Sequence, residues 1–239
     1  ALFKEIEDQN LSLWFESVDL ETSIPQEIVQ KPEIIPCHPQ LYVFDCKQDL
    51  IYLNENNLSI NKLNLYLRRD QTHQVEISNA GEVSYKLNYQ YTYPVPAPNN
   101  LNQAYNAYYQ LYLSPWLKLK TVLLDEKELL PSQISESTAM VRKYDFYLPQ
   151  TINQSHNLNL KIVSNSDNQN SKKTQTPYSV YFQKQPGTND SLKFELKYPL
   201  FFSPKLLTTP LQNSASNTLT GSFKTLPREA IGVLFKSAW

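Results

Sequence analysis

The chain has 239 residues, of which 41% are hydrophobic and 12% aromatic, and its formal net charge is −1. This composition is typical of a folded domain and excludes a disordered chain, while the small net charge argues against recruitment of nucleic acid by a global field. Only 4 residues are Gly. They are too scattered to form a phosphate-binding loop or a nucleophile elbow, which argues against the common nucleotide enzymes and hydrolases.

The first 40 residues are predicted to precede the main domain. Residues 1–20 mix helical spacing with strand alternation, so either structure remains open for them. The segment 23–39 contains four Pro residues. Because Pro lacks a backbone donor and biases the preceding residue away from the helix, this segment is predicted to be an extended connector.

Alternating apolar and polar residues predict strands over most of the remaining chain. Residues 74–78 and 82–95 flank a short connection that ends at Gly81, which predicts a β-hairpin. A second hairpin is predicted between 178–184 and 192–198. Further strands are predicted at 41–45, 50–54, 63–69, 116–124, 139–148 and 158–163 and in the C-terminal segment.

Two segments predict helical structure instead. In residues 101–112, the apolar and aromatic side chains recur at the i, i+3, i+4, i+7 spacing of a helix. The segment 125–130 opens with acidic residues, which favour the first turn of a helix.

Taken together, these segments predict a mainly β (β-rich α+β) protein, with antiparallel, sandwich-like sheets of about ten strands and one or two short helices. Hairpins and half-buried strands favour antiparallel sheets, because parallel sheets need regular crossover connections. The β-rich domain is expected to span 41–239. Breaks near 94–100 and 164–177 leave open a division into two sub-domains.

The aromatic residues between 85 and 116 are the candidate binding surface. Tyr places an apolar ring beside a polar hydroxyl, so a row of such rings suits a groove for a sugar, a peptide or another protein. The alternative is that these rings belong to the margin of the core. The candidate residues are Tyr85, Tyr89, Tyr91, Tyr93, Tyr105, Tyr108, Tyr109, Tyr112 and Trp116.

Cys37 and Cys46 are a candidate disulfide, provided that the chain reverses between them, because an extended connection of nine residues spans about 30 Å. The same residues with His38 and His73 offer soft metal ligands. They lack the paired spacing of a zinc site, so no metal and no cofactor is predicted.

Charge is distributed unevenly along the chain. Residues 1–70 contain 6 basic and 12 acidic residues, a net charge of −6, whereas residues 71–239 contain 16 and 11, a net charge of +5. The two parts are expected either to pack on each other or to link copies of the chain head to tail. The strand with the candidate Tyr residues includes only one Lys, which disfavours nucleic acid as a partner.

These features favour a non-catalytic, exported or surface-associated protein that binds or scaffolds macromolecules in a cell-envelope or secretion assembly, where its partner is a protein or an envelope polymer. A structural subunit of a viral or ribonucleoprotein particle is the first alternative, and a hydrolase without a recognisable motif is the second. A start at Ala1 is compatible with signal removal, polyprotein cleavage or trimming. A periplasmic, cell-surface or secreted location is expected. No apolar run reaches the roughly 18–20 residues of a membrane-spanning helix, so none is predicted.

Overall fold

A computed structural model describes residues 37, 40–41, 46–58, 67–92, 105–138, 140–150, 155–164, 175–183, 190–224 and 230–237. Several predicted features lie outside these residues: the N-terminal segment with most of its connector, most of the strand at 41–45, the break at 94–100 and nearly all of the polar loop that precedes residue 175. Among the described residues, no helix is long and apolar enough to cross a membrane.

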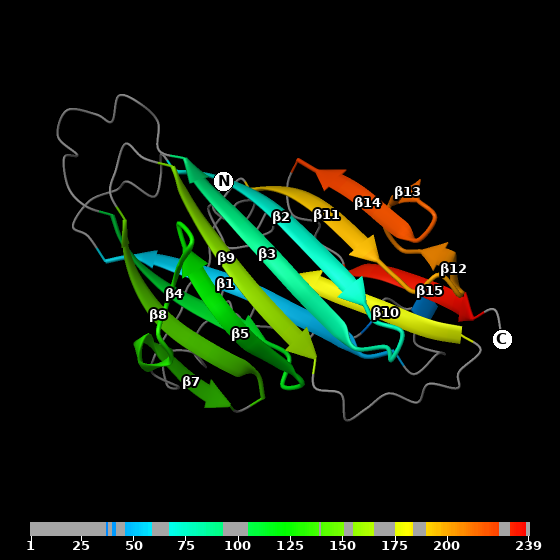
Figure 1. Ribbon diagram of the computed structural model, residues 1–239, viewed down its shortest axis with the longest axis horizontal. Helices are drawn as coiled ribbons and strands as arrows, with labels where there is room; N and C mark the ends of the chain where they lie inside the picture. The colour runs from blue at the N-terminus through cyan, green and yellow to red at the C-terminus, as the bar shows by residue number, and fades with distance from the viewer. Residues whose placement is uncertain are drawn as a thin grey trace, which may run out of the picture.

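Strands of two sheets account for most of the described chain, and one sheet lies in front of the other in Figure 1. The front sheet has eight strands in the order β13-β14-β11-β2-β3-β9-β5-β6. Its strands are β2 (Arg68–Ile77), β3 (Val83–Thr92), β5 (Leu117–Leu124), β6 (Lys127–Glu128), β9 (His156–Ser164), β11 (Ser191–Lys197), β13 (Gln212–Ala215) and β14 (Thr218–Phe223).

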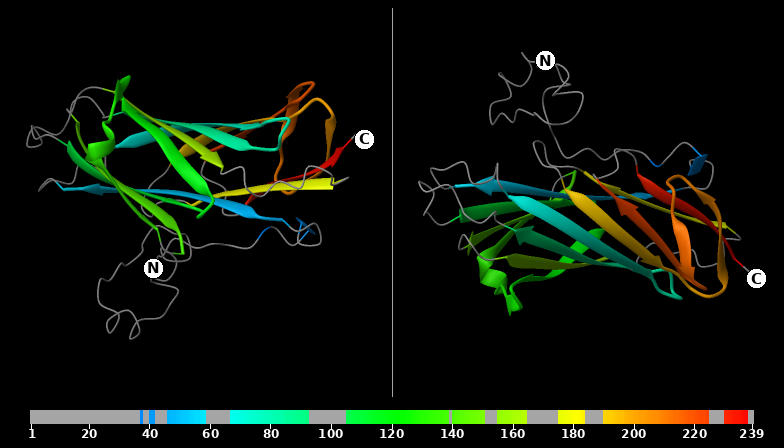
Figure 2. Two further views of the ribbon diagram at one scale, coloured as in Figure 1. Left: turned by 60° about the horizontal axis from the view of Figure 1, so that its bottom comes forward. Right: turned by 90° about the horizontal axis from the view of Figure 1, so that it is seen from above.

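The second sheet has seven strands in the order β12-β15-β10-β1-β4-β8-β7. Its strands are β1 (Gln48–Asn57), β4 (Tyr105–Leu113), β7 (Ile134–Thr138), β8 (Arg142–Gln150), β10 (Gln175–Phe182), β12 (Phe202–Leu207) and β15 (Ile231–Ser237). The left view of Figure 2 shows the two sheets as separate layers. The mainly β, sandwich-like fold is therefore confirmed. The described strands outnumber the expected ten. Helical structure among the described residues consists of 3-10 turns, at η4 (Pro131–Gln133) and at residues 40–41.

The main core lies between the two sheets and follows from the alternation of each strand. On β3, Tyr85, Leu87, Tyr89 and Tyr91 point inward and are buried. On β4, residues 107, 109, 111 and 113 do the same from the opposite sheet. Because successive side chains of a strand point to opposite faces, the residues between them lie on the outer faces of the sandwich.

The connection between β2 and β3 confirms the first predicted hairpin. The two strands pair antiparallel from Arg68 with Thr92 to Ile77 with Val83. Gly81 has a φ of 82°, a left-handed conformation that Gly adopts without steric cost. Its N–H donates to the Ser78 carbonyl oxygen and closes the turn.

The second predicted hairpin is wrong. β10 lies in the seven-stranded sheet between β15 and β1, whereas β11 lies in the eight-stranded sheet between β14 and β2. The two strands therefore belong to different layers. β10 pairs parallel with β1, and β11 pairs parallel with β2. Each sheet is therefore mixed, with one parallel pair among antiparallel ones.

The predicted helix at 101–112 is also wrong, because residues from Tyr105 onward form strand β4. The buried residues Ala107, Tyr109 and Leu111 recur at every second position and pack in the main core. A spacing of two and a helical spacing coexist in this aromatic-rich segment. The strand prevails because it buries a full row of side chains against the opposite sheet.

The acidic segment 125–130 does not start a helix. Asp125 and Glu126 have positive φ values of 49° and 68° and occupy the two central positions of a tight turn between β5 and β6. A turn with positive φ at both central residues matches the right-handed twist of paired strands. The acidic residues thus occupy a hairpin turn rather than a helix N-terminus.

Candidate functional site

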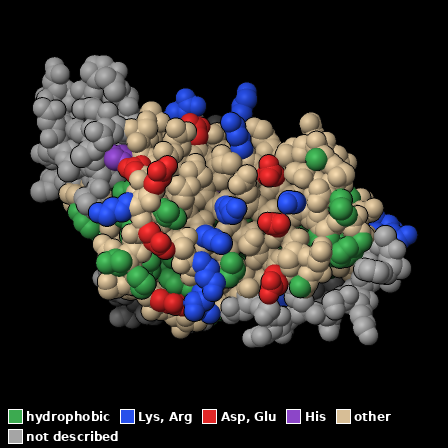
Figure 3. All heavy atoms as spheres, in the orientation of Figure 1, with side chains coloured by type: hydrophobic (Ala, Val, Ile, Leu, Met, Phe, Trp, Pro, Cys, Tyr) green, Lys and Arg blue, Asp and Glu red, His purple; other side chains and the backbone are tan. Residues whose placement is uncertain are grey.

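The outer face of the eight-stranded sheet is a broad polar surface. β2, β3 and β9 alternate between buried inward residues and outward residues that are exposed or half-buried. The outward positions of β3 include Lys86, Asn88 and Gln90. This sheet faces the viewer in Figure 3, where Lys and Arg side chains lie across its middle.

Strand register places the outward residues in two rows across four strands. Gln74 of β2 lies opposite Lys86 of β3, and Lys86 lies opposite Lys161 of β9. Thr121 of β5 lies opposite Lys161 on its other side. The neighbouring row contains Thr72, Asn88, Asn159 and Leu123 in the same strand order.

A groove of about 280 Å³ runs over these two rows. We call it the amide–lysine groove and define it by its outward side chains: Thr72, Gln74, Lys86, Asn88, Thr121, Leu123, Asn159 and Lys161. Leu87 and Leu160, which belong to the core, complete its lining. Apart from Leu123, each of the outward side chains carries an amide, a hydroxyl or an ammonium group. The groove therefore offers both hydrogen-bond donors and acceptors, together with positive charge.

Asn88 and Asn159 are held together in the groove. The Asn88 side-chain NH₂ donates to the Asn159 Oδ1 over 2.9 Å. Each side-chain amide has two donor hydrogens and one carbonyl oxygen. This bond leaves the Asn88 oxygen and the Asn159 NH₂ to bond a further molecule, in orientations that the pair itself fixes.

The two groove lysines lie directly opposite each other. Like charges at directly opposed positions destabilise a sheet, so this arrangement has no structural benefit of its own. In the described part of the chain, neither ammonium group has a carboxylate within ion-pair distance. Two carboxylates on the same face pair with other cations: Glu76 with Lys197 at 3.6 Å, and Asp70 with Arg68 at 3.1 Å. A third, Glu195 of β11, lies two strands from Lys86, opposite Gln74.

A β-bulge lies beside the lysine-rich side of the groove. The pairing between β5 and β9 shifts between Leu119 and Thr121, so that Lys120 is the extra residue beside Lys161. Bulges redirect side chains and are frequent near functional sites. Lys120 is exposed and adds a further positive charge at this rim.

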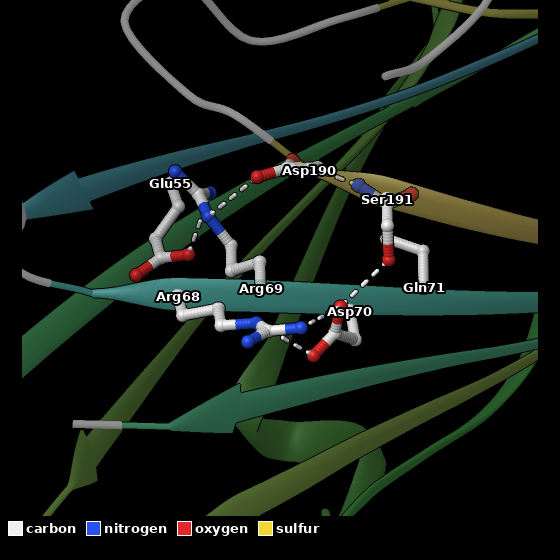
Figure 4. A network of polar contacts seen from close by, with 7 residues as sticks. All are labelled: Glu55, Arg68, Arg69, Asp70, Gln71, Asp190 and Ser191. Carbon is white, nitrogen blue, oxygen red and sulfur yellow. Dashed lines mark hydrogen bonds and ion pairs between the residues drawn. The ribbon is translucent and has the colours of Figure 1, made fainter. Parts of the chain in front are cut away.

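A buried ion-pair network lies on the opposite side of β2, between the sheets. The Arg69 guanidinium pairs with Glu55 of β1 at 3.0 Å and with Asp190 at 3.4 Å, and Asp190 also accepts a hydrogen bond from Gln71 at 2.8 Å. Figure 4 shows Arg68 and Asp70 pointing to the other side of the strand. All four residues of the network are buried. The network links the two sheets and is inaccessible to a large ligand.

A third buried carboxylate, Asp49 of β1, forms no ion pair within the described part of the chain. It accepts hydrogen bonds from the Tyr85 hydroxyl and, at 2.6 Å, from the Trp116 indole N–H. Burial raises the pKa of Asp49 to about 6, although the two hydrogen bonds act in the opposite direction. Its oxygens are used to join β1 to β3 and to the start of β5.

His73 is buried in the core beside Phe182 and Tyr89, with ring centroids 4.3 and 5.5 Å away. Neither ring nitrogen has a hydrogen-bond partner among the described residues. Burial lowers the pKa of His73 to about 3, so the ring is neutral. A cavity of about 10 Å³, the size of a single water site, adjoins it.

The candidate disulfide is present: Cys37 and Cys46 are bonded, with Cα atoms 6.1 Å apart. The cysteines are therefore not metal ligands, and His73 points into the core. Within the described ranges, no group of three His, Cys, Asp or Glu residues is placed to hold a metal ion.

Most of the predicted aromatic surface is directed into the protein. Tyr85, Tyr89, Tyr91 and Tyr109 are buried between the sheets. Tyr112 lies on the other face of its sheet, where it is buried in a separate cluster and stacks on Tyr52 at 5.6 Å. These rings correspond to the core alternative rather than to a solvent-facing groove.

The remaining members of that set have different surroundings. Tyr108 is half-buried on the outer face of the seven-stranded sheet and donates a hydrogen bond to Asp145 over 2.8 Å. Trp116 is half-buried and is held by Asp49. Tyr105 begins β4 without a described side-chain position, and Tyr93 lies outside the described residues. The structure does not bring these rings together into one exposed surface.

Sequence reasoning missed the groove residues, because the aromatic side chains of the same strand are the more unusual sequence feature. The alternation of β3 already separates Lys86, Asn88 and Gln90 from the Tyr residues, and this polar face is the exposed one. Their contact with β9 and β5 depends on strand order, which local alternation does not specify.

The fold and groove define a two-sheet β-sandwich with a polar groove on one outer face. No protein-family model matches the chain, and a search of curated proteins finds no match. The fold is similar to that of a candidate nutrient-binding protein from Legionella pneumophila, with a TM-score of 0.52, 7% identity, and coverage of 79% of this chain and 71% of that one.

Weaker likenesses are to two enzyme structures. For yeast LTA4 hydrolase in complex with bestatin the TM-score is 0.44 at 10% identity, with coverage of 93% of this chain and 33% of that one. For Legionella pneumophila aminopeptidase A the TM-score is 0.40 at 10% identity, with coverage of 76% and 22%. The chain spans about a third or less of the length of these enzymes.

Proposed function

We propose that this chain is a non-catalytic, exported β-sandwich domain that attaches to a polymer or protein of a cell envelope through the amide–lysine groove. The observation that carries the proposal is the groove itself. Its amide, hydroxyl and ammonium groups lie together in the middle of a sheet. Two of its lysines are directly opposed, an arrangement that lowers stability and forms no compensating contact within the sheet.

Two further observations support the proposal. The Cys37–Cys46 disulfide is typical of an oxidising compartment, which favours export over a cytosolic location. The ionisable groups Asp49, Glu55 and Asp190 are buried and engaged in contacts between structural elements. Such use of carboxylates favours a stabilising role over acid–base chemistry.

Sedimentation with an insoluble envelope fraction tests this proposal. The full chain is expected to pellet with envelopes of the cells that produce it, and Asn88→Ala with Asn159→Ala is expected to release it. The matched control is Gln212→Ala with Asn213→Ala, on exposed positions of β13 in the same sheet. Failure to pellet, or equal pelleting of both double variants, would contradict the proposal.

Association between copies of the chain is a separate part of the proposal. The net charges of −6 on residues 1–70 and +5 on the remainder support head-to-tail contact. Sedimentation velocity at about 20 mM and 500 mM salt tests it, because exposed charges are screened at high salt. A mass that rises with concentration only at low salt is expected; a salt-independent monomer would contradict self-association.

A further inference from the structure

We infer that the ligand of the amide–lysine groove is a carboxylate-bearing polysaccharide, an inference that rests on the proposed function. Lys86 and Lys161 supply the charge that recognises a carboxylate. The Asn88–Asn159 pair supplies a donor and an acceptor in fixed orientation for sugar hydroxyls. A uronate residue presents both kinds of group within a single ring.

The position of the lysines explains the charge preference. Directly opposed residues of an antiparallel pair have Cβ atoms about 5 Å apart, so both ammonium groups reach one anion placed between their strands. Lys120, the extra residue of the bulge in β5, is exposed beside Lys161 and adds positive charge near it. An anion in this position also reduces the repulsion between the two lysines. Binding of an anion should therefore stabilise this part of the sheet.

The groove is less suited to an acidic peptide. β2, β3 and β9 are each paired on both sides, so their backbone groups are already used by neighbouring strands. A peptide therefore cannot add to the sheet here as an extra strand, which is a common route to peptide affinity. Recognition has to come from side chains alone.

The groove is also less suited to nucleic acid. Single-stranded nucleic acids are held largely by bases that stack on aromatic rings. The described outward positions of β2, β3, β9 and β5 carry no aromatic side chain, because the rings of β3 all face the core. Leu123 is instead a small apolar contact for the face of a sugar ring.

Calorimetric titration of the full chain with polygalacturonate and with its fully methyl-esterified form tests the inference. The two polymers share a backbone and differ in charge. We expect binding to the acidic form only. Lys86→Gln and Lys161→Gln should each weaken it roughly two- to five-fold, as for an exposed charge contact, and raised salt should weaken it further.

Lys205→Gln is the matched control, since Lys205 is an exposed strand residue of the other sheet. It should leave binding unchanged. Thermal unfolding separates binding from folding: Lys86→Gln should not lower the melting temperature, because it removes a like-charge contact.

The other outcomes overturn the inference in distinguishable ways. Equal binding of the ester, weakened by Asn88→Ala and Asn159→Ala, would reject the charged ligand class and leave the proposed polymer binding in place. Acidic polymer that binds equally to wild type and to the lysine variants would reject this groove as the site. A chain that pellets with envelopes but binds neither polymer would reject the ligand class alone. A chain that neither pellets with envelopes nor binds a polymer would reject the proposed function as well.

Discussion

The Tyr85 hydroxyl of β3 donates a hydrogen bond across the core to the Asp49 carboxylate of β1, and so joins the two sheets. At the other end of β1, Glu55 makes the second such link through Arg69. Both carboxylates lie on the inward face of one strand. The sandwich is thus joined by polar contacts at two places in addition to its apolar core.

Asp49 should make the protein more stable in mild acid. Its pKa is about 6 in the folded protein against an ordinary 3.8, so the folded state binds the proton more tightly than the unfolded state does. This contribution favours folding below pH 4 and is lost as the pH rises through 6, a change of about 2 to 3 kcal/mol. Relative to wild type, Asp49→Asn should therefore gain this amount between pH 4 and pH 7, measured by urea unfolding.

Asp70→Asn is the control for that experiment. A hydrogen bond from Ser191 lowers the pKa of Asp70. The contribution of Asp70 to stability therefore has the opposite sign, and it is lost only at a pH below the ordinary pKa of a carboxyl. A difference between Asp49→Asn and wild type that does not vary with pH would show that Asp49 is not a proton-binding group of the folded protein.

His73 should act in the opposite direction. Its pKa is about 3 in the folded protein and 6.5 ordinarily, so only the unfolded state takes up a proton over this range. Stability is lost as the pH falls below 6.5, by about 1.4 kcal/mol for each pH unit. His73→Gln should remove this loss. The difference in unfolding free energy between His73→Gln and wild type, followed from pH 7 to pH 4, measures it; a constant difference would contradict a neutral, buried imidazole.

Arg69 should be costly to remove. Arg69→Met leaves Glu55 and Asp190 buried without their cation, and loss of one partner of a buried ion pair costs about 3 to 5 kcal/mol. Adding Glu55→Gln should recover part of this loss. A double-mutant cycle by chemical unfolding tests the pairing, and strictly additive losses would contradict it.

The disulfide should stabilise the folded protein by closing a short loop. Closing a loop of nine residues reduces the entropy of the unfolded chain by an amount equivalent to about 2 to 3 kcal/mol. Cys37→Ser with Cys46→Ser should lower stability by that amount, and reduction of the wild type should do the same. Peptide mapping of native material should find the two cysteines bonded; free thiols there would remove the main support for export.

Replacement of Glu126 by Gly should stabilise the protein. Glu126 has a φ of 68°, a left-handed conformation that costs a residue with a side chain more than it costs Gly. Glu126→Gly should raise the free energy of unfolding by about 0.5 to 1 kcal/mol. Glu128→Gly, in the adjacent strand of the same hairpin, is the control and should lower stability instead. A loss of stability in Glu126→Gly would contradict the turn geometry.

Alternation along the chain was sufficient to predict the β fold and the hairpin at Gly81, since alternation identifies each strand locally and this hairpin joins two strands that are neighbours in sequence. The pairing of β10 with β1 and of β11 with β2 was not predictable in this way. β10 and β11 both alternate correctly, but alternation identifies a buried face and not the sheet to which a strand belongs. The parallel pairs with β1 and β2 are formed by residues distant in sequence.

The site shows the same limit. Alternation places Tyr89 and Asn88 on opposite faces of β3. A row of aromatic side chains, however, is compatible with a core face and with a binding face equally well. Only the packing of the second sheet shows that the rings are covered. The groove needs Asn88, Asn159 and Thr121 from three strands, and their proximity follows from strand order alone.

The most direct test of the groove as the working surface is a nuclear magnetic resonance titration with a short oligogalacturonate. The account predicts shifts of the side-chain amide signals of Asn88, Asn159 and Gln74. The signals of Asn54 and Gln110, which bond each other on the outer face of the other sheet, should stay unchanged. Shifts confined to Asn54 and Gln110, or no shifts at saturating ligand, would contradict it.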